Sequence, residues 1–238
     1  NSGTDGLWLA LKALGIRKDD IVLTSDFSFI ASSSEIAAHN AHPVFIDVEK
    51  ATFNIDPEKI ESWLKENATK KNGKTVHAKT GLSVVGILTV DLFGQCANYK
   101  EIKRIADEWN LWIIEDACQA VGAQVDNRMA GSFGDISVFS FYPTKTLGAW
   151  GDGGCCATNN SGLAEKIARL KNHGRHSHYE YLELGINSRL DELQAVVLSH
   201  KLDSLEVNNE KRRTIAQQYK RELETISFIS IPKETIGK

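Results

Sequence analysis

Apolar runs that suit buried strands alternate along this chain with segments of helical periodicity, and this alternation limits the fold more than any other feature. The strand-like runs cover about residues 20–24, 43–48, 83–92, 111–116, 137–142 and 155–158, and the helix-like segments cover about residues 7–14, 30–40, 57–65, 99–109, 163–170 and 191–224. Parallel strands need a crossover connection, usually a helix, so this order predicts an α/β fold with a mostly parallel sheet between helices.

A lysine closely follows one strand-like run, and the residues around it suit anion binding. Ser140 and Thr144 offer hydroxyl groups to a phosphate, and Pro143 fixes the backbone between them. Four glycines in residues 148–154 let the backbone pass close to a bound ring. An amine in a partly dry pocket loses its proton readily and can then attack an aldehyde, so Lys145 is a candidate nucleophile. A solvated lysine in an ordinary loop is the alternative that this stretch leaves open.

A second stretch ends a strand-like run with two carboxylates. Within residues 111–122, an apolar strand ends in Glu115 and Asp116, and small residues follow it. Ligands of open α/β sheets collect at the carboxyl ends of the strands, which places Asp116 at the working edge. A carboxylate there can pair with a protonated pyridine nitrogen, which makes the ring a better electron sink. A helix cap or a structural ion pair is the alternative role for Asp116.

Three ordered segments, residues 115–123, 131–135 and 139–145, together resemble the DegT/DnrJ/EryC1/StrS family of pyridoxal-phosphate-dependent sugar aminotransferases. The resemblance extends over nearly the whole chain and implies the large domain of a fold type I transferase, with the small C-terminal domain largely absent. It also implies an enzyme that uses pyridoxal 5'-phosphate to move an amino group from an amino acid, usually L-glutamate, to a nucleotide-linked keto-sugar. Residues 91–97 resemble members that build diamino or acetamido sugars for bacterial surface polysaccharide.

The resemblance assigns the ring of the cofactor to four residues. Lys145 is implied to bind the cofactor aldehyde covalently and then to move a proton between the amino-acid α-carbon and the cofactor. Asp116 is implied to hold the ring nitrogen protonated, Gln119 to bind the ring hydroxyl, and Phe29 to stack on the ring. Considered without the family, a phenylalanine at a helix start is usually part of a core.

The resemblance places the cofactor phosphate among Gly3, Thr4 and Ser140, with Asn187 contributed by a neighbouring subunit. A homodimer with shared sites follows from that last contact. The residues at the start of the chain agree with this placement, because small and hydroxyl residues at a helix start expose N–H groups at the positive end of the helix dipole. A plain helix cap is the alternative there.

Two other functions compete with an aminotransferase. Sugar dehydratases that use the same cofactor resemble this chain, but they carry a histidine where Lys145 stands. A non-catalytic binding or regulatory protein on the same fold has no need of that lysine, so the complete set of site residues favours an enzyme. Tyr142 and Trp150 are close enough to Lys145 in sequence to contact a substrate.

Composition argues against several other classes of protein. The chain has 238 residues, 42% hydrophobic and 25% charged, which is enough for one large globular domain. A net charge of −3 without a long basic run argues against a nucleic-acid partner. No apolar stretch approaches the ~20 residues of a membrane span. The four cysteines have neither metal-site nor secreted-framework spacing, so we expect reduced thiols and a cytoplasmic location.

The domain organisation is expected to divide near residue 200. Residues 1–200 are assigned to the large pyridoxal-phosphate-binding domain, and residues 201–238 to a long helix and the start of a second domain. The helical pattern at 191–224 is interpreted as one long helix, with a kink as an option. Residues 66–82 are polar and basic and are expected to form a solvated loop. Because the family is longer at both ends, we expect the chain to be part of a longer protein.

Overall fold

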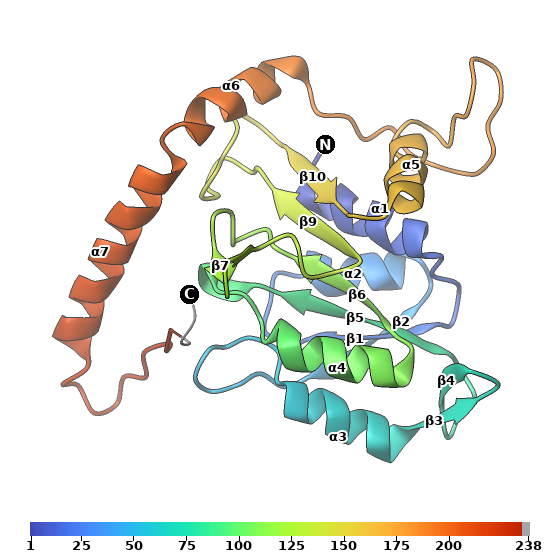
Figure 1. Ribbon diagram of the computed structural model, residues 1–238, viewed down its shortest axis with the longest axis horizontal. Helices are drawn as coiled ribbons and strands as arrows, with labels where there is room; N and C mark the ends of the chain where they lie inside the picture. Colours follow the sequence, from blue (N-terminus) through green and yellow to red (C-terminus); the bar gives the residue numbers. More distant parts are fainter. Residues whose placement is uncertain (235–238) are drawn as a thin grey trace.

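The computed structural model describes residues 1–234 and contains a six-stranded sheet between helices (Figure 1). Its strands are β1 (Ile21–Ser25), β2 (His42–Ile46), β5 (Val84–Val90), β6 (Trp112–Asp116), β9 (Ile136–Ser140) and β10 (Gly154–Ala157). They lie in the order β10-β9-β6-β5-β1-β2, and every neighbouring pair is parallel except β10 with β9. The expected α/β fold with a mostly parallel sheet is therefore confirmed.

Helices cover both faces of the sheet because successive strand residues point to opposite sides. One face packs against α1 (Gly3–Leu14), α2 (Ala31–Ala38) and α5 (Ser161–Leu170), and the other against α3 (Pro57–Asn67) and α4 (Tyr99–Trp109) (Figure 1). In β1, Val22 packs in the core between the sheet and α1, α2 and α5, and Leu23 packs in the core between the sheet and α3 and α4. Both residues are fully buried. Within residues 1–234 no helix combines the length and apolar character that a membrane crossing requires.

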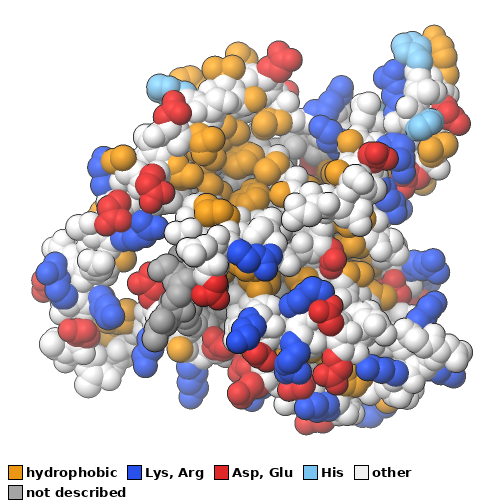
Figure 2. Space-filling model, viewed as in Figure 1, with side chains coloured by type: hydrophobic (Ala, Val, Ile, Leu, Met, Phe, Trp, Pro, Cys, Tyr) orange, Lys and Arg blue, Asp and Glu red, His pale blue; other side chains and the backbone are white. Residues whose placement is uncertain are grey.

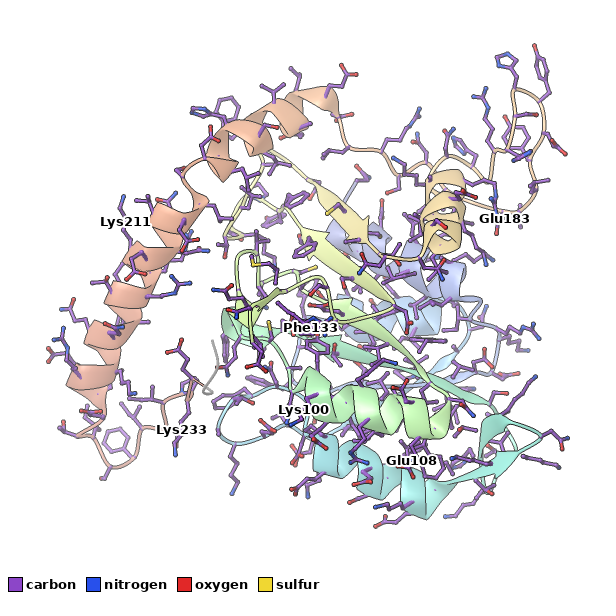
Figure 3. All side chains as sticks on the ribbon, in the orientation of Figure 1. Lys100, Glu108, Phe133, Glu183, Lys211 and Lys233 are labelled. Carbon is purple, nitrogen blue, oxygen red and sulfur yellow. The ribbon has the colours of Figure 1, made fainter. Side chains whose placement is uncertain are left out.

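The segment after the sheet forms two helices separated by a break, where the sequence predicted one long helix with a possible kink. They are α6 (Glu192–Leu202) and α7 (Leu205–Leu223). The break is a turn in which the N–H of Ser204 donates to the carbonyl of Lys201 at 3.2 Å. The chain then turns back from α7 to the body, where the N–H of Lys233, labelled in Figure 3, donates to the carbonyl of Ala51. The expected domain division near residue 200 stays a prediction.

Residues 66–82 are mostly exposed to solvent, as their composition predicted, but the expectation of a loop is wrong because residues 68–77 form a hairpin. Two small antiparallel hairpins lie outside the main sheet, one of β3 (Ala68–Lys71) with β4 (Lys74–His77) and one of β7 (Gln124–Val125) with β8 (Arg128–Met129). Asn72 and Gly73 turn the first hairpin with φ of 52° and 76°, as a tight hairpin turn requires. Thr75 is buried and donates to the carbonyl of Trp109, which fixes this hairpin against the end of α4.

A buried carboxylate joins β6 to the segment that leads into β9. Glu115 accepts hydrogen bonds from the N–H groups of Gly131, Phe133 (2.8 Å) and Gly134 (3.2 Å), and from the hydroxyl of Ser137 (2.7 Å). Glu115 is fully buried, so these donors replace the water that its carboxylate loses on folding. The glycine-rich segment between β8 and β9 is thereby tied to the centre of the sheet.

A second buried carboxyl group lies beside Glu115. Asp91 follows β5, just before the short 3₁₀ turn η1 (Leu92–Gly94), and accepts hydrogen bonds from the N–H of Ala97 (2.9 Å) and the hydroxyl of Tyr99 (2.8 Å). Burial, followed by the neighbouring charge of Glu115, raises the pKa of Asp91 well above its usual value. A carboxyl group that keeps its proton is neutral and adds no second negative charge beside Glu115.

This pair predicts a pH dependence of stability that Asp91→Asn should reduce. A carboxyl whose pKa is higher in the folded than in the unfolded state stabilises the fold at low pH. That contribution is lost as the pH rises from the unfolded pKa, about 4, through the raised folded pKa. We therefore expect the denaturation midpoint of the wild type to fall with rising pH, and to fall less steeply in Asp91→Asn, whose side chain stays neutral.

The measurement is urea denaturation of the full-length protein over a pH series, with Asp203→Asn as the matched exposed control. Asp203 is exposed, so its substitution should leave the slope of the midpoint against pH unchanged. Equal slopes for the wild type and Asp91→Asn would contradict a protonated Asp91.

Candidate active site

The carboxyl ends of the parallel strands surround one cavity of about 520 Å³. Seven of the eight residues that the sequence assigned to the cofactor line it, and they come from α1, from the segment before α2, and from the ends of β6 and β9. These residues are Gly3, Thr4, Phe29, Asp116, Gln119, Ser140 and Lys145. The structure thus brings together side chains up to 142 positions apart, from Gly3 to Lys145, at the edge where an α/β sheet binds its ligands.

Asp116 is a buried carboxylate held in a fixed orientation. Its Oδ2 accepts a hydrogen bond of 2.9 Å from the hydroxyl of Ser32 in α2, and its Oδ1 accepts one of 3.2 Å from the N–H of Cys118. Ser32 is held in turn by a 2.9 Å contact with the hydroxyl of Ser28. A carboxylate with lone pairs to spare in this cavity can accept a further hydrogen bond from a ligand N–H.

The sequence did not point to Ser32 as a partner of Asp116. The two residues are 84 positions apart, and Ser32 stands among three consecutive serines with no spacing pattern that distinguishes it. Its burial, at 1% exposure, is the property that separates it from the half-buried Ser33 and Ser34, and burial follows from the packing of α2 on the sheet.

Cys118 also lines the cavity, but it is poorly suited to act as a nucleophile. Burial raises the pKa of its thiol far above the usual value, and the adjacent negative charge of Asp116 raises it further. A thiol must lose its proton to attack, so Cys118 stays an inert wall residue at neutral pH. The amine of Lys145, which also lines the cavity, stays the predicted nucleophile.

The first turn of α1 presents unpaired N–H groups at the cavity. Ser2 caps the helix by accepting a hydrogen bond from the N–H of Asp5 at 3.0 Å, while the helix offers no acceptor to the N–H groups of Gly3 and Thr4. Gly3 lies so close to β9 that a Cβ there would stand 2.8 Å from the Cβ of Ser140. This cradle of backbone N–H groups beside the Ser140 hydroxyl is suited to an anion such as phosphate.

Lys145 lies in a tightly folded loop after β9. Its backbone N–H donates to the carbonyl of Tyr142 at 2.8 Å, and the loop closes where the N–H of Ala149 donates to the carbonyl of Phe141 at 2.8 Å. The side chain is partly buried at the cavity wall. Within the described part of the chain its ammonium group has neither a hydrogen-bond nor a salt-bridge partner, which leaves it available to a ligand.

Gln119 and Phe29 complete the predicted ring site. The side-chain carbonyl of Gln119 accepts a hydrogen bond of 3.1 Å from the N–H of Phe93, so its amide group is left to donate to a ligand. Phe29 lines the cavity with 68% of its surface exposed, and a ring in that position can stack on a bound ring. The expected roles of both residues stay predictions.

Asn187 does not line this cavity. It is exposed, and its Oδ1 accepts a hydrogen bond of 2.7 Å from the Nε of Arg189. The sequence placed Asn187 at the site of a neighbouring subunit, and a single chain neither supports nor contradicts that role. Among residues 1–234 no group of three His, Cys, Asp or Glu side chains is placed to hold a metal ion.

Comparison with known proteins relates the chain to a family of aminotransferases. The pattern that defines the DegT/DnrJ/EryC1/StrS aminotransferase family matches residues 1–236. A pleiotropic regulatory protein of Geobacillus stearothermophilus is 40% identical over 239 residues, which cover 100% of this chain and 60% of the relative. The dTDP-3-amino-3,6-dideoxy-alpha-D-galactopyranose transaminase of Aneurinibacillus thermoaerophilus is 41% identical over 237 residues, which cover 100% of this chain and 61% of the relative.

A solved structure agrees with these matches. NtdA from Bacillus subtilis, crystallised with the bound cofactor PMP, superposes with a TM-score of 0.84 at 32% identity, covering 99% of this chain and 51% of that chain. The present chain therefore spans less than two thirds of the length of each of these relatives.

The close approach at Gly3 predicts that Gly3→Ala is destabilising. The added Cβ would stand 2.8 Å from the Cβ of Ser140 and 3.0 Å from the Sγ of Cys118, so α1 has to move away from β9. We expect a loss of roughly 1–3 kcal/mol, measured by thermal denaturation of the full-length protein, together with weaker binding of inorganic phosphate.

The matched control is Gly162→Ala, in the first turn of α5. There the nearest atom to an added Cβ is the side-chain oxygen of Asn160 at 3.3 Å, and alanine favours a helix more than glycine does. The control should be close to neutral. A stable Gly3→Ala variant that binds phosphate normally would show that the helix start is not a phosphate site.

Proposed function

Because the chain belongs to the DegT/DnrJ/EryC1/StrS aminotransferase family, a family of pyridoxal-phosphate-dependent sugar transaminases, we propose that it transfers an amino group from an amino acid to a nucleotide-linked keto-sugar. One observation carries this proposal: the cavity combines the free amine of Lys145, the buried carboxylate of Asp116 and the open N-terminus of α1. Pyridoxal phosphate has a counterpart for each, namely an aldehyde, a ring nitrogen and a phosphate.

The residues present fit that cofactor. The N–H groups of Gly3 and Thr4 and the hydroxyl of Ser140 would hold the phosphate, which needs the close backbone approach that only glycine allows at position 3. Gln119 would donate to the ring hydroxyl, and Phe29 would cover one face of the ring. When bound, the cofactor supplies a pyridine ring that withdraws electrons from the amino-acid carbon.

Two side chains of this chain would then handle protons. Asp116, held by Ser32 and the N–H of Cys118, would keep the proton on the ring nitrogen. The Nζ of Lys145 would take the proton from the α-carbon of the amino donor, for which we propose L-glutamate, and pass it to the exocyclic carbon that was the aldehyde carbon of the cofactor. The same two residues serve the reverse direction with the keto-sugar as acceptor.

The sugar substrate is proposed from the relatives and from the open side of the cavity. The Aneurinibacillus relative is named as a transaminase of a dTDP-linked amino sugar. Tyr142 lines the cavity and is 51% exposed, so its ring is placed to contact an acceptor. We therefore propose a role in amino-sugar biosynthesis, of the kind that supplies bacterial surface polysaccharide.

A homodimer is the proposed assembly. On α6, Leu198 packs inward against the loop that carries Lys145, whereas Leu193 and Val196 are 80% and 68% exposed. Trp150, in that loop, is also 80% exposed. Figure 2 shows hydrophobic side chains gathered on the face of the molecule next to α6. A second copy packed there would cover these side chains and would bring its Asn187 segment, which directly precedes α6, close to the cavity.

A regulatory role without catalysis is the second candidate. The Geobacillus relative, at 40% identity, is named a pleiotropic regulatory protein, which favours this role. The arrangement around Lys145 favours catalysis instead, because a protein that only binds a ligand gains nothing from an unpaired amine beside a fixed carboxylate. The two candidates make opposite predictions for Lys145.

The test is covalent attachment of the cofactor at Lys145. We expect full-length protein incubated with pyridoxal phosphate to be yellow, and borohydride to fix one reduced cofactor on the peptide that contains Lys145, as read by mass spectrometry. Lys145→Ala should lose this adduct and should lose amino transfer from glutamate to nucleotide-linked keto-sugars by a factor on the order of a thousand or more.

Lys100→Ala is the matched control, because Lys100 is an exposed lysine of α4, which covers the face of the sheet opposite to α1 (Figure 3). It should keep both the adduct and the activity. A Lys145→Ala variant that still aminates sugars would contradict the proposed enzyme, and an adduct without any amino transfer would favour the regulatory alternative.

A further inference from the structure

The loop that carries Lys145 is held from outside the cavity by two polar side chains of α6. The ammonium group of Lys201 donates to the carbonyl of Gly148 at 2.6 Å, and the side-chain oxygen of Gln194 accepts from the N–H of Trp150 at 2.8 Å. Lys201 is partly buried, which strengthens a hydrogen bond from a charged donor. Both contacts fall within five residues of Lys145 in sequence.

The part of the loop that Lys201 holds is closely packed and has little freedom to adjust. A Cβ at Gly148 would lie 2.4 Å from the carbonyl oxygen of Pro143, so the two ends of the turn around Lys145 press against each other. Leu147 and Ala149 are buried on both sides of Gly148 and pack against Leu198 of α6. The position of the Lys145 backbone therefore depends on where α6 holds this turn.

The next helix contacts a second loop that contributes to the cavity lining. The side-chain amide of Asn209 in α7 donates to the carbonyl of Val121 at 3.3 Å. A Cβ at Gly122 would stand 2.6 Å from that amide nitrogen, so the helix approaches the backbone directly. This turn follows Asp116 and contains Gln119, and it is closed by the N–H of Ala120 donating to the carbonyl of Ala117 at 2.9 Å.

We propose that α6 and α7 act as a bracket that sets the separation of the two functional loops, with Lys201 and Gln194 as positioning residues for Lys145 and Asn209 as the positioning residue for the Gln119 turn. The proposal rests on the proposed function of Lys145. A lysine in the last turn of a helix is often explained by the helix dipole alone. That explanation does not account for the short contact between Lys201 and a carbonyl of the loop three residues beyond Lys145.

The test compares Lys201→Met with Lys211→Met. Methionine keeps the length of the side chain and removes the donor. Lys211 is an exposed lysine of α7, labelled in Figure 3, and serves as the matched control. In cofactor-free full-length protein, we expect amide hydrogen exchange in residues 142–150 to become roughly tenfold faster in Lys201→Met, with β6 unchanged. Lys211→Met should exchange as the wild type does.

Catalysis supplies the second readout. In the loaded enzyme we expect kcat of Lys201→Met to fall roughly tenfold with KM nearly unchanged, because the amine is misplaced while the substrate contacts persist. Lys201→Arg should recover most of the loss, since a guanidinium can donate to the same carbonyl. If Lys201→Met does not fold, Gln194→Met replaces it, with the exposed Gln217→Met of α7 as its control.

The outcomes separate the bracket from the proposed function. Unchanged exchange in residues 142–150 together with unchanged kcat overturns the bracket and leaves the proposed function standing. Exchange that rises equally across the whole sheet, or equally in Lys211→Met, also overturns it, since the effect is then not local. A wild-type protein that forms no cofactor adduct at Lys145 overturns the proposed function, whatever the exchange shows.

Discussion

The buried carboxylate of Glu115 is the contact on which the arrangement of the site rests. It gathers three backbone N–H groups of residues 131–134 and the hydroxyl of Ser137, so the chain that leads into β9 is fixed against β6. Because neighbouring residues of a strand point to opposite faces, the same strand that buries Glu115 on the α4 side delivers Asp116 to the cavity on the α1 side. An apolar residue in place of Glu115 would leave these donors unsatisfied, which is costly in a buried position.

The cavity itself is a consequence of parallel topology. In such a sheet all carboxyl ends meet at one edge, and here the ends of β6 and β9 are joined there by the first turn of α1. The charges along the wall are complementary to one kind of ligand. The helix start attracts an anion, Asp116 attracts a proton-bearing nitrogen, and Lys145 offers an amine to an electrophilic carbon. A small aromatic aldehyde with a phosphate group meets all three demands.

Much of the fold was accessible from local patterns, because hydrophobic periodicity and helix caps act over a few residues. The amphipathic pattern at Tyr99–Trp109 has the same bounds as α4, with Asn98 as its cap. The hairpin at 68–77 was missed because its residues are polar, although the Asn72–Gly73 turn is the local signal that marks it. The break at residues 203–204 was open in the sequence, since no proline or glycine stands there to end the helix.

The amino-acid sequence alone determined the type of fold and the strand ends that carry Asp116 and Lys145. It also determined the chemistry that those two side chains can perform. Tertiary packing decided which distant groups hold them in place: Ser32 on Asp116, Gln194 and Lys201 on the loop after Lys145, and Asn209 on the turn after Gln119. The physical reason is the range of the interactions. Periodicity and capping join residues a few positions apart, whereas these hydrogen bonds join residues 44 to 88 positions apart, and only the packing of whole helices on the sheet brings such partners within reach.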